Sequence, residues 1–97
     1  MKTTQQTIAL TVHNHPGVMS HITGLFARRA FNLEAIVCVP EPCGTRSRML
    51  LWIRQADRLD QIVRELQRLY DVMTIEIMES RACPSLDRIR EHILRIT

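Results

Sequence analysis

The chain has 97 residues, which is room for one domain, and it is 45% hydrophobic and 24% charged, as in ordinary globular proteins. Thirteen basic and ten acidic side chains leave a formal charge of +3, and the four aromatic residues offer few rings for stacking nucleic-acid bases. No apolar run approaches the roughly 20 residues of a membrane-spanning helix, and the polar N-terminus lacks the apolar core of a signal peptide. We therefore expect a cytoplasmic protein.

The first predicted elements are a strand over residues 7–12 and a helix running from about Pro16 to Ala30. Bulky apolar residues alternate with smaller ones in the strand, which indicates one face on a core. The helix carries apolar residues at helical spacing: Val18, Ile22, Leu25 and Phe26. Pro16 suits a first helical position, with Asn14 or His15 near the cap.

Two strands and a helix follow. Residues 33–39 are rich in β-branched side chains and end at a proline, and residues 46–54 form an apolar run, so we expect the two strands to pair as a hairpin. The run of 46–54 is apolar on both faces, which indicates a central strand. Asp57 is a candidate N-cap for a second helix whose apolar spacing continues to Tyr70.

The last predicted elements are a strand over 72–78 and an amphipathic helix over 86–96. The order β-α-β-β-α-β predicts an α+β, ferredoxin-like domain over residues 7–79, with a four-stranded antiparallel sheet and two helices on one face. Residues 1–6 would form an N-terminal tail and residues 80–97 a helical C-terminal extension. Right-handed crossovers place the first and third strands in the centre of the sheet.

The second strand is predicted to lie at an edge of the sheet, and it is apolar apart from Glu34. Such an edge invites pairing with another chain, so we expect a homodimer.

The loop after the first strand is the best candidate for a ligand site. At the start of a helix, backbone N–H groups without intrahelical acceptors lie at the positive end of the helix dipole, and both features favour binding of a carboxylate. Gly17 has no Cβ and lets a ligand approach the main chain, while Asn14 offers both a donor and an acceptor. The alternative is that Asn14 caps the helix and Gly17 serves packing.

Two stretches carry a resemblance to a known family. The string LTVHNHPGVM (residues 10–19), followed by GLFARRAFNLE (residues 24–34), resembles the ACT domain of the small regulatory subunit of acetohydroxyacid synthase, also called acetolactate synthase. The likeness runs from about Thr7 to Met78. The second stretch is the more specific one, and its RRAF resembles the short, single-domain form that accompanies isozyme I.

The resemblance implies a dimer of ACT domains that binds a branched-chain amino acid, usually valine, and transmits feedback inhibition to a separate catalytic subunit. That subunit would carry thiamine diphosphate, FAD and magnesium, while this chain would hold no cofactor. The residues that match the ligand-contacting loop are Asn14, His15, Pro16, Gly17, Val18 and Met19. Asn32 and Ile36 match positions on or just before the partner's second strand.

Three further positions have a functional and a structural interpretation. Arg28 and Arg29 could form a docking patch for the catalytic subunit, or they could be solvated charges that suit the last turn of a helix. Gly24 costs about 1 kcal/mol in a helix relative to alanine, and we expect close packing of the helix on the sheet, rather than a direct role in ligand binding, to be the reason for it.

No metal site or catalytic centre is predicted. His13, His15 and His21 are joined by no carboxylate or cysteine at ligand spacing. The odd set of cysteines (Cys38, Cys43 and Cys83) matches no zinc pattern, and Cys38 is expected to act as a small buried hydrophobe. The sequence contains no nucleophile–base pair that would indicate a catalytic activity of this chain itself.

Two rival functions stay open. One is a free-standing ACT-domain sensor of amino acids with another target. The other is a ferredoxin-like RNA-binding module, favoured by the pI near 9.1. The RNA-binding alternative is weakened because Trp52 is the only aromatic residue on the two central strands.

Overall fold

The computed structural model describes residues 5–54, 58–78 and 86–96. The elements in chain order are β1 (Gln5–His13), α1 (Val18–Arg28), β2 (Asn32–Pro40), β3 (Arg46–Arg54), α2 (Leu59–Gln67), β4 (Val72–Met78) and α3 (Leu86–Ile96). The four strands form one antiparallel sheet in the order β2-β3-β1-β4. The predicted ferredoxin-like architecture, with the first and third strands in the centre, is confirmed.

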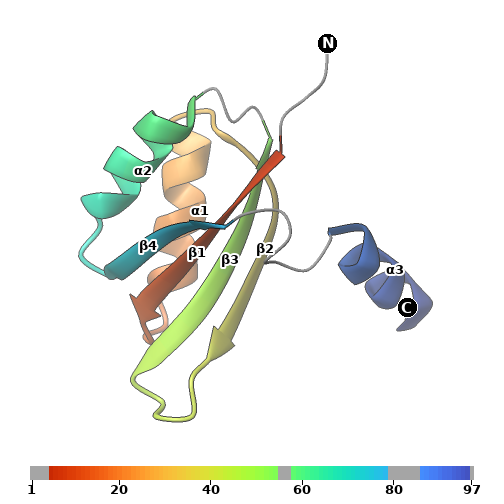
Figure 1. The fold of residues 1–97 in the computed structure, drawn as a ribbon. Helices are drawn as coiled ribbons and strands as arrows, with labels where there is room; N and C mark the ends of the chain where they lie inside the picture. Colours follow the sequence, from red (N-terminus) through yellow and green to blue (C-terminus); the bar gives the residue numbers. More distant parts are fainter. Residues whose placement is uncertain (1–4, 55–57, 79–85, 97) are drawn as a thin grey trace.

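The core lies between the sheet and the two helices α1 and α2, which cover one face of it (Figure 1). Alternate residues of β1 and β3 point to this face, and the apolar sides of both helices pack on them. The buried core comprises Ile8, Leu10, Val12, Val18, Ile22, Leu25, Phe26, Phe31, Met49, Leu51, Ile53, Ile62 and Leu66. The four core positions predicted for the first helix are among them.

The ends of the first two elements differ from the prediction. β1 begins at Gln5, within the stretch expected to be a tail, because Gln5 and Gln6 pair with β3. α1 begins at Val18 with Gly17 as its N-cap, since the residues before it form a turn. The helix ends at Arg28, and Ala30 then adopts a positive φ of 54° that leads the chain toward β2.

The second helix is shorter than predicted. It begins at Leu59 and ends at Gln67, while the expected cap Asp57 lies outside the described residues. Tyr70 was predicted on the apolar face of this helix, but it lies in the turn after it, is 88% exposed and stacks on His13. The turn is needed because the chain must reverse to bring β4 beside β1.

α3 lies beyond β2, apart from the layer that α1 and α2 form (Figure 1). A groove separates it from β2 and β3, and the lining includes Ala35, Val37 and Trp52 of the strands and Leu86 and Ile89 of α3. Among the described helices, none is long and apolar enough to cross a membrane.

Candidate functional site

Three loops meet at one end of the sheet, where β1 and β2 end and β3 and β4 begin. They are the loop between β1 and α1, the hairpin between β2 and β3, and the turn between α2 and β4. Backbone hydrogen bonds join them: the Asn14 N–H donates to the Thr45 carbonyl (3.0 Å), and the His13 N–H donates to the Asp71 carbonyl (2.9 Å). The N-terminus of α1 is at this end too.

Asn14 ties the first loop to the hairpin. Its side-chain amide donates to the Gly44 carbonyl at 3.0 Å, and Gly44 sits in the left-handed region with φ 79°. The N-cap of α1 is Gly17, and no side chain of the described residues forms a capping hydrogen bond to the helix, so the alternative in which Asn14 caps the helix is wrong. Asn14 is exposed and stands at the junction of two loops.

His15, His21 and Asp71 form a cluster beside this loop. The His15 Nε2 donates to one carboxylate oxygen of Asp71, and the His21 Nδ1 lies 2.6 Å from the other. The Gly17 N–H donates to the His15 Nδ1 at 3.1 Å, so that nitrogen carries a lone pair and the proton of a neutral His15 is on Nε2. The cluster therefore links the candidate ligand loop to the start of β4.

The Asp71 carboxylate is only 5% exposed. Hydrogen bonds from His21, and then from His15, lower its pKa, although burial acts in the opposite direction. Asp71 is thus held as a carboxylate between two imidazoles. The expectation that no carboxylate joins the histidines was wrong, because a residue 50 positions after His21 reaches them only through the tertiary fold.

The other residues predicted in this loop lie in different surroundings. Val18 is 4% exposed with its side chain in the core, whereas Pro16 is exposed and Met19 is 38% exposed. Gly17 has an ordinary φ of −89°, and a Cβ there would lie 3.4 Å from the His15 ring. The side of Gly17 where a Cβ would lie therefore faces the His15 imidazole. The backbone conformation of Gly17 is one that any residue can adopt.

Asn32 and Ile36 are not near this loop in the same chain. Both are on β2, which runs parallel to β1 because each pairs antiparallel with β3. Asn32 is aligned with Arg54 at the opposite end of the sheet, and Ile36 is in the middle of the strand, partly buried against the core. A single chain does not bring the two halves of the predicted site together.

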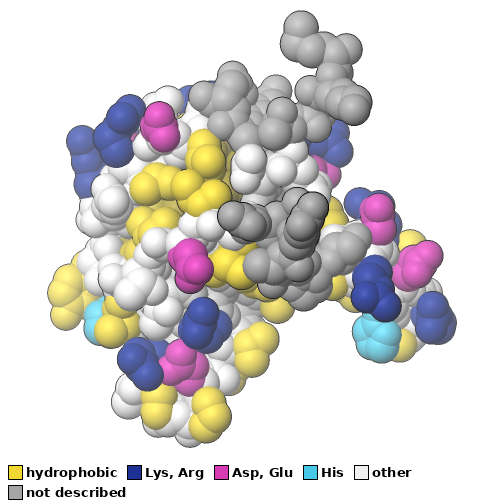
Figure 2. All heavy atoms as spheres, in the orientation of Figure 1, with side chains coloured by type: hydrophobic (Ala, Val, Ile, Leu, Met, Phe, Trp, Pro, Cys, Tyr) yellow, Lys and Arg dark blue, Asp and Glu magenta, His cyan; other side chains and the backbone are white. Residues whose placement is uncertain are grey.

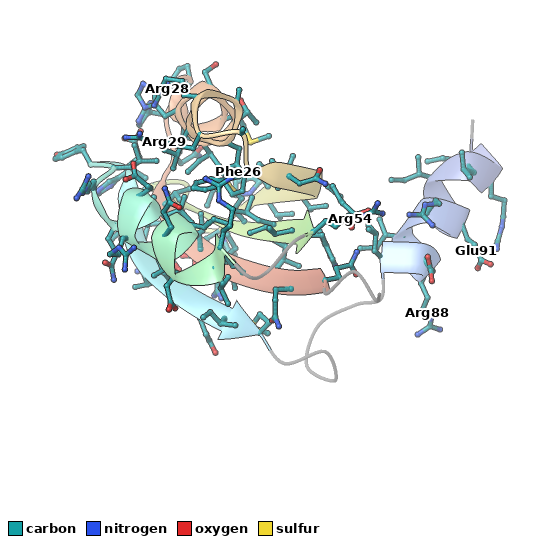
Figure 3. The ribbon with its side chains drawn as sticks, turned by 90° about the horizontal axis from the view of Figure 1, so that it is seen from above. Phe26, Arg28, Arg29, Arg54, Arg88 and Glu91 are labelled. Atoms are coloured by element: carbon teal, nitrogen blue, oxygen red, sulfur yellow. The ribbon has the colours of Figure 1, made fainter. Side chains whose placement is uncertain are left out.

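Arg28 and Arg29 lie at the far end of α1 from the loop. Figure 3 shows Arg28 on the side of α1 away from the sheet and Arg29 nearer to α2. The Arg29 Nη2 forms an ion pair with Glu65 of α2 at 3.2 Å. Among the described residues, a Cβ on Gly24 would meet only the Arg28 guanidinium, at 3.2 Å, and no atom of the sheet within 4 Å. The expected packing reason for Gly24 is wrong.

The hairpin carries an ion pair and an exposed thiol. Figure 2 shows basic and acidic side chains beside each other at this end of the molecule, and Glu41 pairs with Arg46 at 2.9 Å. Hydrogen bonds from Thr45 lower the pKa of the exposed Cys43 thiol to about 7. Cys38 packs partly buried against the core, as predicted.

The fold is that of an ACT domain. The structure resembles the crystal structure of the ACT domain of GTP pyrophosphokinase from Chlorobium tepidum with a TM-score of 0.66. That likeness covers 79% of this chain and all of the other at 20% identity, and it shows the fold alone.

Closer relatives identify the family within this class. Residues 8–74 match the model of the acetohydroxyacid synthase small subunit-like ACT domain, and the chain belongs to this family. It is 44% identical over 73 residues to the acetolactate synthase isozyme 1 small subunit of Escherichia coli K12, covering 75% of this chain and 76% of the relative. It is also 34% identical over 90 residues to a probable acetolactate synthase small subunit of Archaeoglobus fulgidus, covering 91% of this chain and 57% of that one.

A solved structure agrees with this assignment. The acetolactate synthase small subunit from Thermotoga maritima matches with a TM-score of 0.72 and 28% identity over 79% of this chain and 48% of its own length. The resemblance that two short motifs indicated is thus confirmed over most of the domain.

Proposed function

We propose that this chain is a regulatory subunit whose dimer binds a branched-chain amino acid, valine, and thereby inhibits the catalytic large subunit of an acetohydroxyacid synthase. The observation that carries the proposal is the position of Asn14 and the start of α1 at the same end of the sheet. The first turn of a helix has N–H groups without intrahelical acceptors, which suit the carboxylate of an amino acid. The exposed Met19 adds an apolar contact for the side chain.

A dimer through β2 would complete the site. β2 is an edge strand of nine residues whose only charged side chain, Glu34, is already paired with Arg54 at 2.8 Å. If two β2 strands pair antiparallel about Ile36, the middle residue, the partner's Asn32 lies opposite Pro40. The partner's Asn32 is then three strand spacings, or about 14 Å, from the end of β1. The ligand would then lie between Asn14 of one chain and Asn32 of the other.

The proposal assigns the chemistry to another subunit. Thiamine diphosphate, FAD and magnesium would be bound by the catalytic subunit, and this chain would contribute only the effector site and a docking surface. The location would be cytoplasmic, where amino-acid biosynthesis occurs.

The substitution Asn14→Ala tests the site. A lost hydrogen bond in a desolvated site costs about 1–3 kcal/mol, so valine affinity in calorimetry should fall about 5- to 150-fold. Gln5→Ala is the matched control, since it removes a similar exposed hydrogen bond (2.8 Å, to Glu34) at the other end of the sheet. Unchanged valine affinity in a folded Asn14→Ala protein would contradict the site.

Parallel titrations with leucine and isoleucine identify the effector. A free-standing sensor with another target would bind an amino acid but would neither associate with nor inhibit the catalytic subunit in a reconstitution assay. An RNA-binding function is disfavoured because Trp52 is 1% exposed and therefore not available to stack on a base.

A further inference from the structure

We propose that the histidine–aspartate cluster, His15, His21 and Asp71, is a binding site for a divalent first-row transition metal such as zinc. One donor atom from each of the three side chains lies within 4.8 Å of the other two. The two imidazole nitrogens point to different oxygens of one buried carboxylate. The cluster joins the loop before α1, α1 itself and the turn before β4.

The spacing of the donors fits such an ion with a small adjustment. Ligand atoms about 2.0–2.1 Å from a tetrahedral zinc ion are about 3.3 Å apart. His21 Nδ1 and Asp71 Oδ2 are 2.6 Å apart and must separate by less than about 1 Å. No two of the three donor atoms are farther apart than 4.8 Å, so any pair must close by at most about 1.5 Å. The imidazoles can provide this movement because the side chains of His15 and His21 are 37% and 58% exposed, while Asp71 stays fixed in the interior.

The chemistry of the donor set selects the ion. Two imidazoles and one carboxylate are a typical set for zinc with a fourth position open to solvent or to a small ligand. Magnesium and calcium prefer oxygen donors and would find only the carboxylate. In the described part of the chain, Asp71 forms ion pairs only with these two histidines, so no arginine there competes with a metal ion for its charge.

Metal binding would change one hydrogen bond in the candidate effector loop. In the metal-free chain the Gly17 N–H donates to the lone pair of His15 Nδ1. A metal ion on Nε2 requires the proton of the neutral ring to be on Nδ1, which then no longer accepts from Gly17. The Gly17 amide is released, and its NMR resonance should shift on titration.

The test is a calorimetric titration of the untagged protein with zinc chloride in the absence of any amino acid, followed by cobalt(II) as a spectroscopic probe. We expect one ion per chain and the visible absorption of a low-symmetry cobalt site. His21→Gln changes an exposed side chain and should lower zinc affinity at least about tenfold. Magnesium chloride at the same concentrations should leave the Gly17 resonance unchanged.

Two matched variants separate this site from other donors. His92→Gln removes a histidine of α3, and Cys43→Ser removes the exposed thiol with a pKa of about 7, so both should keep the full zinc affinity. Absence of zinc binding, or binding that survives both His21→Gln and Asp71→Asn in folded proteins, would overturn the proposal. Because no amino acid is present, these outcomes are independent of valine binding.

Discussion

Glu34 joins three strands at the end of the sheet opposite the candidate site. It occupies the irregularity in the pairing of β2 with β3, and its carboxylate accepts hydrogen bonds from Arg54 and Gln5, both at 2.8 Å. The Arg54 hydrogen bond, and then the Gln5 hydrogen bond, hold the pKa of Glu34 below its ordinary value of 4.5. The folded state thus favours the ionised form of this side chain.

The lowered pKa of Glu34 predicts a pH-dependent contribution to stability. Because the folded state binds its proton less readily than the unfolded state, the contribution is present above about pH 4.5 and is lost as the pH falls through the folded pKa. Glu34→Gln should therefore lower the unfolding free energy at pH 7, and the difference from wild type should shrink below pH 4.5. Urea denaturation from pH 7 to pH 3 measures this. An equal difference at every pH would contradict the prediction, and the exposed Glu91→Gln serves as control.

At the scale of elements, α1 connects the candidate effector site at its start to Arg28 and Arg29 at its end. Its inner side is fixed by the core, with Phe26 between the helix and the sheet (Figure 3). Its outer side carries Gly24, where a Cβ would meet only the end of a flexible arginine. Packing on the sheet does not require a glycine there.

We predict that Gly24→Ala stabilises the isolated subunit. Alanine is favoured over glycine in a helix by about 1 kcal/mol, and the Arg28 guanidinium can move away, so the melting temperature should rise by about 4–8 °C. Differential scanning calorimetry measures the change. If the same variant binds the catalytic subunit less tightly, the glycine is needed for close approach of that partner; a fall in melting temperature would show that the helix is more confined than its contacts indicate.

A test of Arg29 in docking must separate the loss of its ion pair with Glu65 from the loss of a contact with the catalytic subunit. Arg29→Glu places two carboxylates together and costs up to about 1 kcal/mol of stability, independent of any partner. The double variant Arg29→Glu/Glu65→Arg restores an ion pair between the helices. If Arg29 docks the catalytic subunit, the double variant should keep valine binding and lose valine inhibition of the reconstituted enzyme. Full inhibition by the double variant would exclude this docking role.

At the scale of the whole molecule, the proposed dimer predicts different effects for substitutions at the two edges of the sheet. β2 carries Val39, 54% exposed, and β4 carries Met73, 45% exposed. If the dimer forms through β2, Val39→Lys should weaken it and Met73→Lys should not, because only the first adds a charge at the interface. Sedimentation at micromolar concentration, with and without valine, distinguishes dimer from monomer. A wild-type monomer under both conditions would contradict the proposed site.

The sequence by itself determined the fold and the family. Alternation in 7–12 and the helical spacing around Val18 and Ile62 specify which face of each of these elements is buried, and the order of elements leaves few topologies. In 72–78 the alternation is misleading, because Met73 and Ile77 are exposed and only Val72 and Ile75 pack against the core. The ends of elements do not follow from the spacing: Tyr70 continues the helical pattern, yet the reversal into β4 takes it out of the helix. Tertiary pairing, not local spacing, decides where a helix stops.

Only the tertiary structure decided which distant residues meet. Asp71 has no local signal that connects it to His15 and His21, and it reaches them because β4 begins beside the end of β1. In the same way, the side chain of Asn14 in the loop after β1 reaches Gly44 in the β2–β3 hairpin, and Arg29 at the end of α1 pairs with Glu65 of α2. Periodicity records which side of an element is apolar, whereas contacts between polar side chains depend on strand register and loop paths, which a single sequence does not encode as a pattern.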